Sequence, residues 1–170
     1  MVTEEEIRSK DFIDVLPEEV SMRITSGDVQ RFEDNEAKLR KKIRDAKIKF
    51  DRDINNPSSS YKEFANMCFM DESTVKKTIA GTLKVTRHFL YKMAVGLKMT
   101  VEQANEYFVL CEGVLQENRL ADYICIRALK DKDDMYTFIE EFEKFTKIKI
   151  YRGGCNKKIK WKENKGDNLS

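Results

Sequence analysis

The sequence lacks any long apolar run. Its longest purely apolar stretch is the short segment Tyr107–Cys111, far below the roughly 20 residues that a membrane-spanning helix requires. The acidic N-terminus has none of the features of a signal peptide. We therefore expect a soluble, cytoplasmic protein with no membrane partner.

Residues that bind metals or form disulfides are also scarce. His88 is the one histidine, and the four cysteines lie far apart with no Cys-x-x-Cys pair. This inventory argues against a zinc site, and a disulfide framework is not expected without a secretory leader. We predict three of the cysteines, Cys68, Cys111 and Cys125, to be small core residues, and Cys155 to be exposed.

Motifs of catalysis are absent as well. The sequence has no glycine-rich phosphate loop and no nucleophile motif, and its many carboxylates fall on predicted helix surfaces or in acidic runs. These absences predict that the protein is not an enzyme and needs no cofactor.

The net charge of +2 conceals a strong asymmetry along the 170 residues. Residues 1–36 carry 4 basic and 11 acidic side chains, giving −7; residues 37–60 carry 8 and 3, giving +5; residues 151–170 carry 6 and 2, giving +4. Such basic segments favour contact with a polyanion, and a solvated lysine-rich face is the alternative explanation. The acidic N-terminal part suggests a further hypothesis, that it folds back on the basic surface as an autoinhibitor.

Apolar residues recur at helical spacing through most of the chain. The pattern predicts seven helices with these inward positions: Leu39 to Phe50; Tyr61 to Cys68; Val75 and Ile79; Phe89 to Leu97; Val101 to Cys111; Leu120 to Ala128; Met135 to Phe142. Thr3 with Glu6, and Thr100 with Gln103, have the spacing of capping boxes, while Gly81 and Gly113 are predicted helix ends.

These signals divide the chain into four parts. We predict an acidic arm over 1–34, a five-helix domain over 35–114, a two-helix extension over 115–146, and a basic tail or β-hairpin over 147–170. In the hairpin alternative, Ile148, Ile150, Ile159 and Trp161 share one face. The predicted fold class is mainly α.

The segment from Tyr61 to Leu97 satisfies the steric needs of two helices that cross at a tight turn. Ala65 is small where the second helix approaches, Val75 provides an apolar wedge, and Gly81 ends the second helix. These spacings, with the downstream stretch Met93–Thr100, resemble the helix-turn-helix of the phage-repressor (Xre-type) family over residues 37–113. The chain departs from that family at the turn, where Phe69 replaces the usual glycine, and at Thr78, which replaces a usually apolar residue.

The stretch from Thr100 to Phe142 also resembles a helical module of clostridial proteins that sometimes accompanies a macro domain. This second resemblance supports the architecture of the last two helices. Because no macro domain is present, it implies no ADP-ribose function. The last helices are predicted to form a dimer or partner platform.

The repressor resemblance implies that residues 71–80 form a recognition helix in a DNA major groove. Base-reading contacts are then expected from Glu72, Ser73, Lys76 and Lys77. Phosphate contacts are expected from Lys41, Lys42, Lys84, Thr86, Arg87, Lys158, Lys160 and Lys162.

We therefore predict a sequence-specific DNA-binding protein, a transcriptional regulator that binds double-stranded DNA. The carboxylates of Asp71 and Glu72 and the Phe69 substitution favour an alternative: a phage or mobile-element module that uses the same scaffold to bind a protein. A third alternative is a single-strand binder that uses Tyr151, Trp161 and the lysines of the tail.

Overall fold

Eight helices make up the part of the chain that the computed structural model describes, residues 1–13, 26–54 and 61–150. They are α1 (Glu4–Ser9), α2 (Ser26–Asp53), α3 (Tyr61–Met67), α4 (Glu72–Ala80), α5 (Arg87–Gly96), α6 (Val101–Phe108), α7 (Leu120–Asp131) and α8 (Met135–Thr146). No strand occurs within these ranges. The mainly helical class predicted from the sequence is confirmed, and so are the seven helices predicted from apolar spacing.

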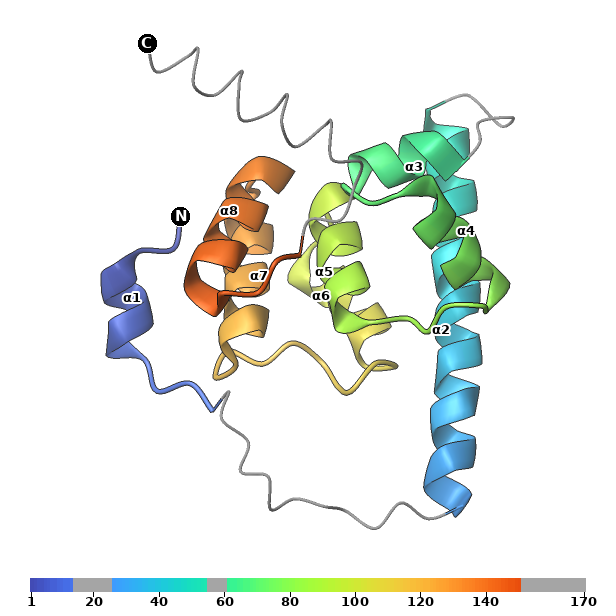
Figure 1. The fold of residues 1–170 in the computed structure, drawn as a ribbon, viewed down its shortest axis with the longest axis horizontal. Helices are drawn as coiled ribbons and strands as arrows, with labels where there is room; N and C mark the ends of the chain where they lie inside the picture. The colour runs from blue at the N-terminus through green and yellow to red at the C-terminus, as the bar shows by residue number, and fades with distance from the viewer. Residues whose placement is uncertain (14–25, 55–60, 151–170) are drawn as a thin grey trace.

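The long helix α2 forms one edge of the molecule, with α3 and α4 packed along it (Figure 1). Helix α5 is central, because it contacts α6, α7 and α8, while α7 and α8 pack against each other. Helix α1 lies on the opposite side of the molecule from α2, beyond α7 and α8 (Figure 1). Every helix from α2 to α8 therefore has at least one helical neighbour over which to bury its apolar face.

One contiguous core joins these helices. It extends in sequence from Leu39 on α2 to Ile150 after α8, and four phenylalanines, Phe64, Phe108, Phe138 and Phe142, are fully buried in it. The predicted core cysteines Cys68 and Cys125 are also completely buried, and Cys111 is half-buried. The apolar stripe of α8 is consequently used inside the protomer, which removes it as a seam for a dimer.

Local signals in the sequence fix several helix ends. Thr100 and Gln103 form the predicted capping box of α6, with each side chain bound to the other residue's backbone N–H. Gly81 ends α4 in the left-handed region at φ 87°.

Two other predicted helix signals are met only in part. At α1, Thr3 accepts a hydrogen bond from the Glu6 amide as predicted, but the Glu6 carboxylate binds Arg127 and does not complete the capping box. Gly113 does not end α6, which stops at Phe108; it lies in the following turn.

The last part of the predicted arm over 1–34 lies in a helix. Helix α2 begins at Ser26, so the predicted boundary between residues 34 and 35 falls inside a helix. Residues 1–13 are held on α7 and α8: Glu6 binds Arg127 at 2.6 Å, the Phe12 ring packs on Tyr123, and the Ile13 amide donates to Asn118 O at 2.8 Å. This stretch therefore does not cover the basic surface as an autoinhibitor would.

The predicted tail is described only from Lys147 to Ile150, and these residues form no strand. Ile150 is buried, and its amide donates to the Glu143 carboxylate at 3.0 Å. The hairpin, Cys155 and the tail contacts predicted for Tyr151, Lys158, Lys160, Trp161 and Lys162 lie outside the described residues.

Candidate nucleic-acid interface

Helices α3 and α4 are joined by a tight turn over Cys68–Asp71. The Met70 amide donates to Ala65 O at 2.9 Å, and the Cys68 amide donates to Phe64 O at 3.1 Å. These two hydrogen bonds use carbonyl groups at the C-terminal end of α3 before the chain turns into α4. Ala65 and Val75 are both buried between the helices and α2. The small residue and the apolar wedge picked out in the sequence thus lie inside the packed helix pair.

Phe69 occupies the left-handed region in this turn, at φ 50°. Glycine adopts this conformation at little cost, whereas a residue with a Cβ is strained there. The Phe69 ring packs edge-on against Tyr136 of α8, with ring centroids 4.8 Å apart. The side chain that strains the turn therefore also ties it to α8.

Helix α4 has two distinct faces. Val75, Thr78 and Ile79 are buried on one face. The solvent-exposed face carries Ser73, Lys76, Lys77 and Ala80. Three of the four predicted base-reading residues, Ser73, Lys76 and Lys77, are therefore accessible to a ligand.

Glu72, the fourth predicted base reader, is half-buried and pairs with Lys76 at 3.5 Å. An i,i+4 ion pair on a helix surface is weak, because water and salt screen it. A stronger anionic partner of Lys76 can therefore displace the Glu72 carboxylate. Asp71 occupies the N-cap position of α4, but its side chain makes no capping hydrogen bond. Its exposed carboxylate adds negative charge at the start of the helix.

Cations of α2 lie on several faces of that helix. Arg40 and Arg44 face the C-terminal end of α4: Arg44 donates to Ile79 O at 3.4 Å, and a Cβ added to Gly81 would lie 2.7 Å from Arg40 Nη1. Their charge suits the negative end of the helix dipole. Sequence reasoning missed both arginines, since only the fold places α2 beside α4.

The two α2 lysines predicted to contact phosphate are divided. Lys42 turns toward α6, where it pairs with Glu106 at 3.7 Å and lies 5.0 Å from the ring centroid of Tyr107. Lys41 is exposed to solvent. We therefore retain Lys41 as a candidate phosphate contact and do not place Lys42 beside α4.

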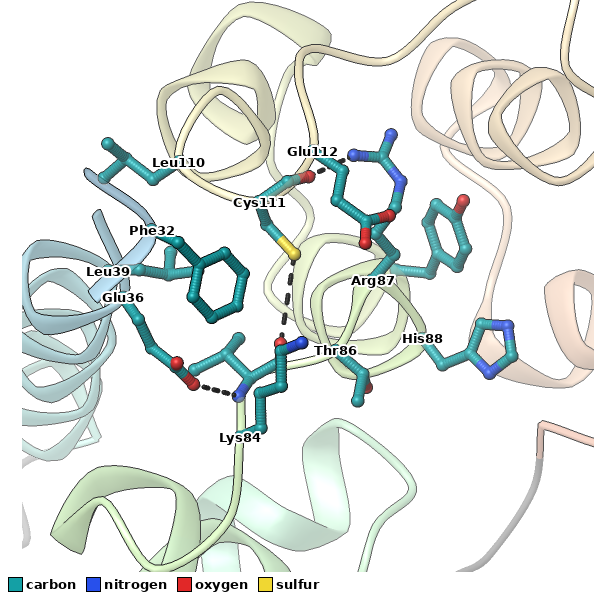
Figure 2. Close-up of a pocket in the computed structure, with 12 residues that line it drawn as sticks. Phe32, Glu36, Leu39, Lys84, Thr86, Arg87, His88, Leu110, Cys111 and Glu112 are labelled. Atoms are coloured by element: carbon teal, nitrogen blue, oxygen red, sulfur yellow. Dashed lines mark hydrogen bonds between the residues drawn. The ribbon is translucent and has the colours of Figure 1, made fainter. Parts of the chain in front are cut away.

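The loop after α4 carries the other predicted phosphate contacts (Figure 2). Lys84 is exposed, and its ammonium lies 4.4 Å from the centroid of the Phe32 ring on α2. Thr86 is the N-cap of α5, with its hydroxyl accepting from the Phe89 amide at 3.1 Å. Both residues border a cavity of about 390 Å³ between α2 and the turn after α6.

Arg87 is committed to the interior. Its guanidinium donates to Cys111 O, to Gly113 O at 2.7 Å, and to both carboxylate oxygens of Asp122 at 3.0 and 2.9 Å. Tyr91 donates to the same carboxylate. Because these contacts use its donors within the protein, we remove Arg87 from the predicted phosphate contacts.

The pKa values of Arg87 and Tyr91 in this buried cluster are both raised. Although burial opposes its charge, hydrogen bonds with Tyr91 and Asp122 raise the pKa of Arg87. Burial, followed by the charge of Asp122, raises the pKa of Tyr91 well above its usual value. Arg87 stays cationic and Tyr91 neutral across the physiological range, so the cluster clamps the turn between α6 and α7 rather than exchanging protons.

The chain matches no family model, no curated protein and no solved structure. In the part of the chain that the structure describes, no three His, Cys, Asp or Glu residues are grouped so as to hold a metal ion. No helix in those ranges has both the length and the apolar character needed to cross a membrane.

Proposed function

We propose that this protein is a sequence-specific DNA-binding regulator, in which α3, the Cys68–Asp71 turn and α4 act as a helix-turn-helix. The observation that carries the proposal is the division of α4 into a buried face and an exposed face bearing Ser73, Lys76 and Lys77. Hydroxyl and ammonium groups on an exposed helix are suited to hydrogen bonding with base edges in a major groove.

Neighbouring groups support this orientation. The exposed Lys84 and Thr86 follow α4 in the chain, as phosphate contacts would, and Lys41 adds charge on α2. Phosphate contacts fix the position of the helix without reading sequence. Arg40 and Arg44 of α2 add positive charge at the C-terminal end of α4.

The test is selection of the purified full chain on a random duplex library at low and near-physiological salt. We expect enrichment of a defined site that persists at the higher salt, because base contacts depend less on counterion release than phosphate contacts do. Lys76→Ala with Lys77→Ala should lower affinity for that site by at least tenfold, from a cost of about 1–3 kcal/mol for each good base contact.

A matched control separates base contacts from general charge. Lys130→Ala with Lys144→Ala removes two exposed cations of α7 and α8 and should leave site affinity within about twofold. Equal losses in the two double variants, with circular dichroism unchanged, would show that the binding is nonspecific and contradict the proposal.

A second candidate function is a protein-binding module on the same scaffold. It is favoured by the carboxylate of Asp71, which is exposed and does not cap α4, and by the pairing of Glu72 with Lys76. A chain that selects no duplex but retains one protein in a pull-down, and loses it on Asp71→Asn, would support this second function.

A further inference from the structure

Helix α2 runs alongside α4 (Figure 1), and its residue Arg40 lies against Gly81, where α4 ends. A Cβ added to Gly81 would lie 2.7 Å from Arg40 Nη1 and 3.4 Å from Arg40 Cζ. Gly81 also has a positive φ of 87°, so the same glycine serves the turn and the close contact. The guanidinium group of Arg40 therefore packs on the backbone in a space that a side chain at position 81 would fill.

The donors of this guanidinium group are unused within the described part of the chain. Arg40 Nε is buried without a hydrogen-bond partner, and the side chain forms no ion pair with a described residue. Glu36, four residues earlier and at the right spacing for an ion pair, accepts from the Val85 amide at 3.0 Å instead. A guanidinium group has five N–H donors, and those of Arg40 are available to an anion.

Capping of α4 does not account for Arg40. Lys77 O accepts the Thr82 amide at 2.9 Å and the Thr82 hydroxyl group at 3.2 Å. Ile79 O accepts from Arg44 at 3.4 Å. These carbonyl groups in the last turn of α4 are paired without Arg40, so Arg40 contributes its charge to this helix end but none of the capping hydrogen bonds.

The charged side chains of α2 and α4 make this end of α4 suitable for an anion. Arg44 is exposed one turn further along α2, and Lys77 is exposed in the last turn of α4. The one carboxylate within α4 belongs to Glu72, nine residues before Gly81, which is roughly 14 Å along a helix axis. The Gly81 end is therefore the more positive end of the candidate interface.

We propose that Arg40 binds a phosphate of the DNA backbone at the Gly81 end of α4, with Arg44 as a second cation beside it. The inference rests on the proposed function, and it identifies the backbone contact that holds the C-terminal end of the recognition helix. A guanidinium group binds two oxygens of one phosphate through parallel N–H donors, a geometry that lysine cannot reproduce. Such a contact adds affinity on every DNA sequence without reading any of them.

The experiment is fluorescence anisotropy of the full chain on two labelled duplexes, the site selected from the library and an unrelated duplex of equal length. Binding is measured at salt concentrations between roughly 0.05 and 0.2 M. Arg40→Gln should weaken binding to both duplexes by about tenfold at the lowest salt, as expected for loss of one hydrogen-bonded charge. The slope of log affinity against log salt should become shallower by about one, because one phosphate contact is lost.

Two further variants separate charge, geometry and location. Arg40→Lys should retain the salt slope, because the charge remains, and should lose part of the affinity, because the bidentate geometry is lost. The matched control is Arg52→Gln, which removes an exposed arginine from the last turn of the same helix and should bind like the parent chain. Circular dichroism and urea unfolding check that each variant is folded.

Either of two results would overturn the proposal. Equal affinities and salt slopes in Arg40→Gln and Arg52→Gln would leave Arg40 with a structural role, while sequence selection by the parent chain would keep the proposed function standing. A loss in Arg40→Gln that is confined to the selected site would make Arg40 a base reader.

Failure of the proposed function is distinguishable from failure of this contact. A library that selects no sequence contradicts the proposed function, yet a shallower salt slope for Arg40→Gln on an arbitrary duplex would still support the phosphate contact. A chain that binds neither duplex at any salt concentration would overturn both.

Discussion

At the scale of single residues, Phe69 shows two opposing effects in one side chain. A residue other than glycine at positive φ costs roughly 1–2 kcal/mol, and Phe69 lies at φ 50°. Its edge-to-face contact with Tyr136 contributes about 0.5–1.5 kcal/mol beyond burial. The two magnitudes are similar, which explains how the turn tolerates phenylalanine at a positive φ.

Comparing Phe69→Gly with Phe69→Ala isolates the backbone effect, because both variants lose the ring. We expect the glycine variant to be more stable by about 1 kcal/mol, since only alanine retains a Cβ in the left-handed region. Urea denaturation measures the difference. The reverse order is expected at Lys77, an exposed position within α4, where glycine should cost about 1 kcal/mol relative to alanine. A Phe69→Ala chain as stable as Phe69→Gly would contradict the account of strain.

Local residue roles were predictable from sequence, and distant partners were not. Gly81 ends α4 and Thr100 caps α6 because of groups within a few residues of them, so their spacing reveals their roles. Arg87 binds Asp122, which is 35 residues away. Nothing near Arg87 in the sequence indicates this pair, and so the residue was predicted to contact phosphate.

At the scale of the elements, the candidate interface depends on a close approach of α3 and α5 at Gly96. A Cβ added there would lie 2.6 Å from Met67 O and 3.0 Å from the Cα of Cys68. Both atoms belong to the backbone at the end of α3, so a side-chain rotation cannot relieve the overlap. The position of α3, and through the turn that of α4, is therefore set by the absence of a side chain on α5.

We expect Gly96→Ala to destabilise the protein by about 1–3 kcal/mol, the usual cost of overpacking, despite the better helix propensity of alanine. It should also shift the amide resonances of α3 and α4. Gly113→Ala is the comparison: an added Cβ meets no atom within 4 Å there, but φ is +92°, so about 1 kcal/mol of strain is expected with no change in α3. Unchanged stability and resonances in Gly96→Ala would show that the helices separate easily.

Helices were predictable where one of their faces is buried, and less so elsewhere. Leu39 and Ile43 are buried on α2, and their spacing revealed the second half of that helix. None of residues 30–38 is buried, so the first half has no inward apolar stripe for the sequence to show. The predicted arm extended to residue 34 for this reason.

At the scale of the whole molecule, the predicted division into a five-helix domain and a two-helix extension is not visible in the packing. Helix α5 contacts both α7 and α8. The rings of Tyr91 and Phe142 lie 5.7 Å apart across that contact, and Tyr91 also binds the buried Asp122 of α7. The last two helices thus complete the core on which the candidate interface rests.

This shared core predicts that a fragment of residues 26–114 does not fold cooperatively. Without α7 and α8, the apolar face of α5 around Tyr91 is exposed to water, and Tyr91 and Arg87 lose the Asp122 carboxylate. At roughly 25 cal/mol for each Å² of apolar surface that is no longer buried, the loss is large compared with the stability of a small domain. Urea unfolding, followed by circular dichroism and by dye binding to exposed apolar surface, measures the effect. The matched fragment, residues 26–150, keeps α7 and α8 and, of the described residues, lacks 1–13, with contacts such as the part-exposed Glu6–Arg127 pair. It should unfold in a single transition at lower urea than the full chain. A cooperative, well-dispersed fragment 26–114 would instead show that the candidate interface is a domain of its own, with α7 and α8 as an accessory.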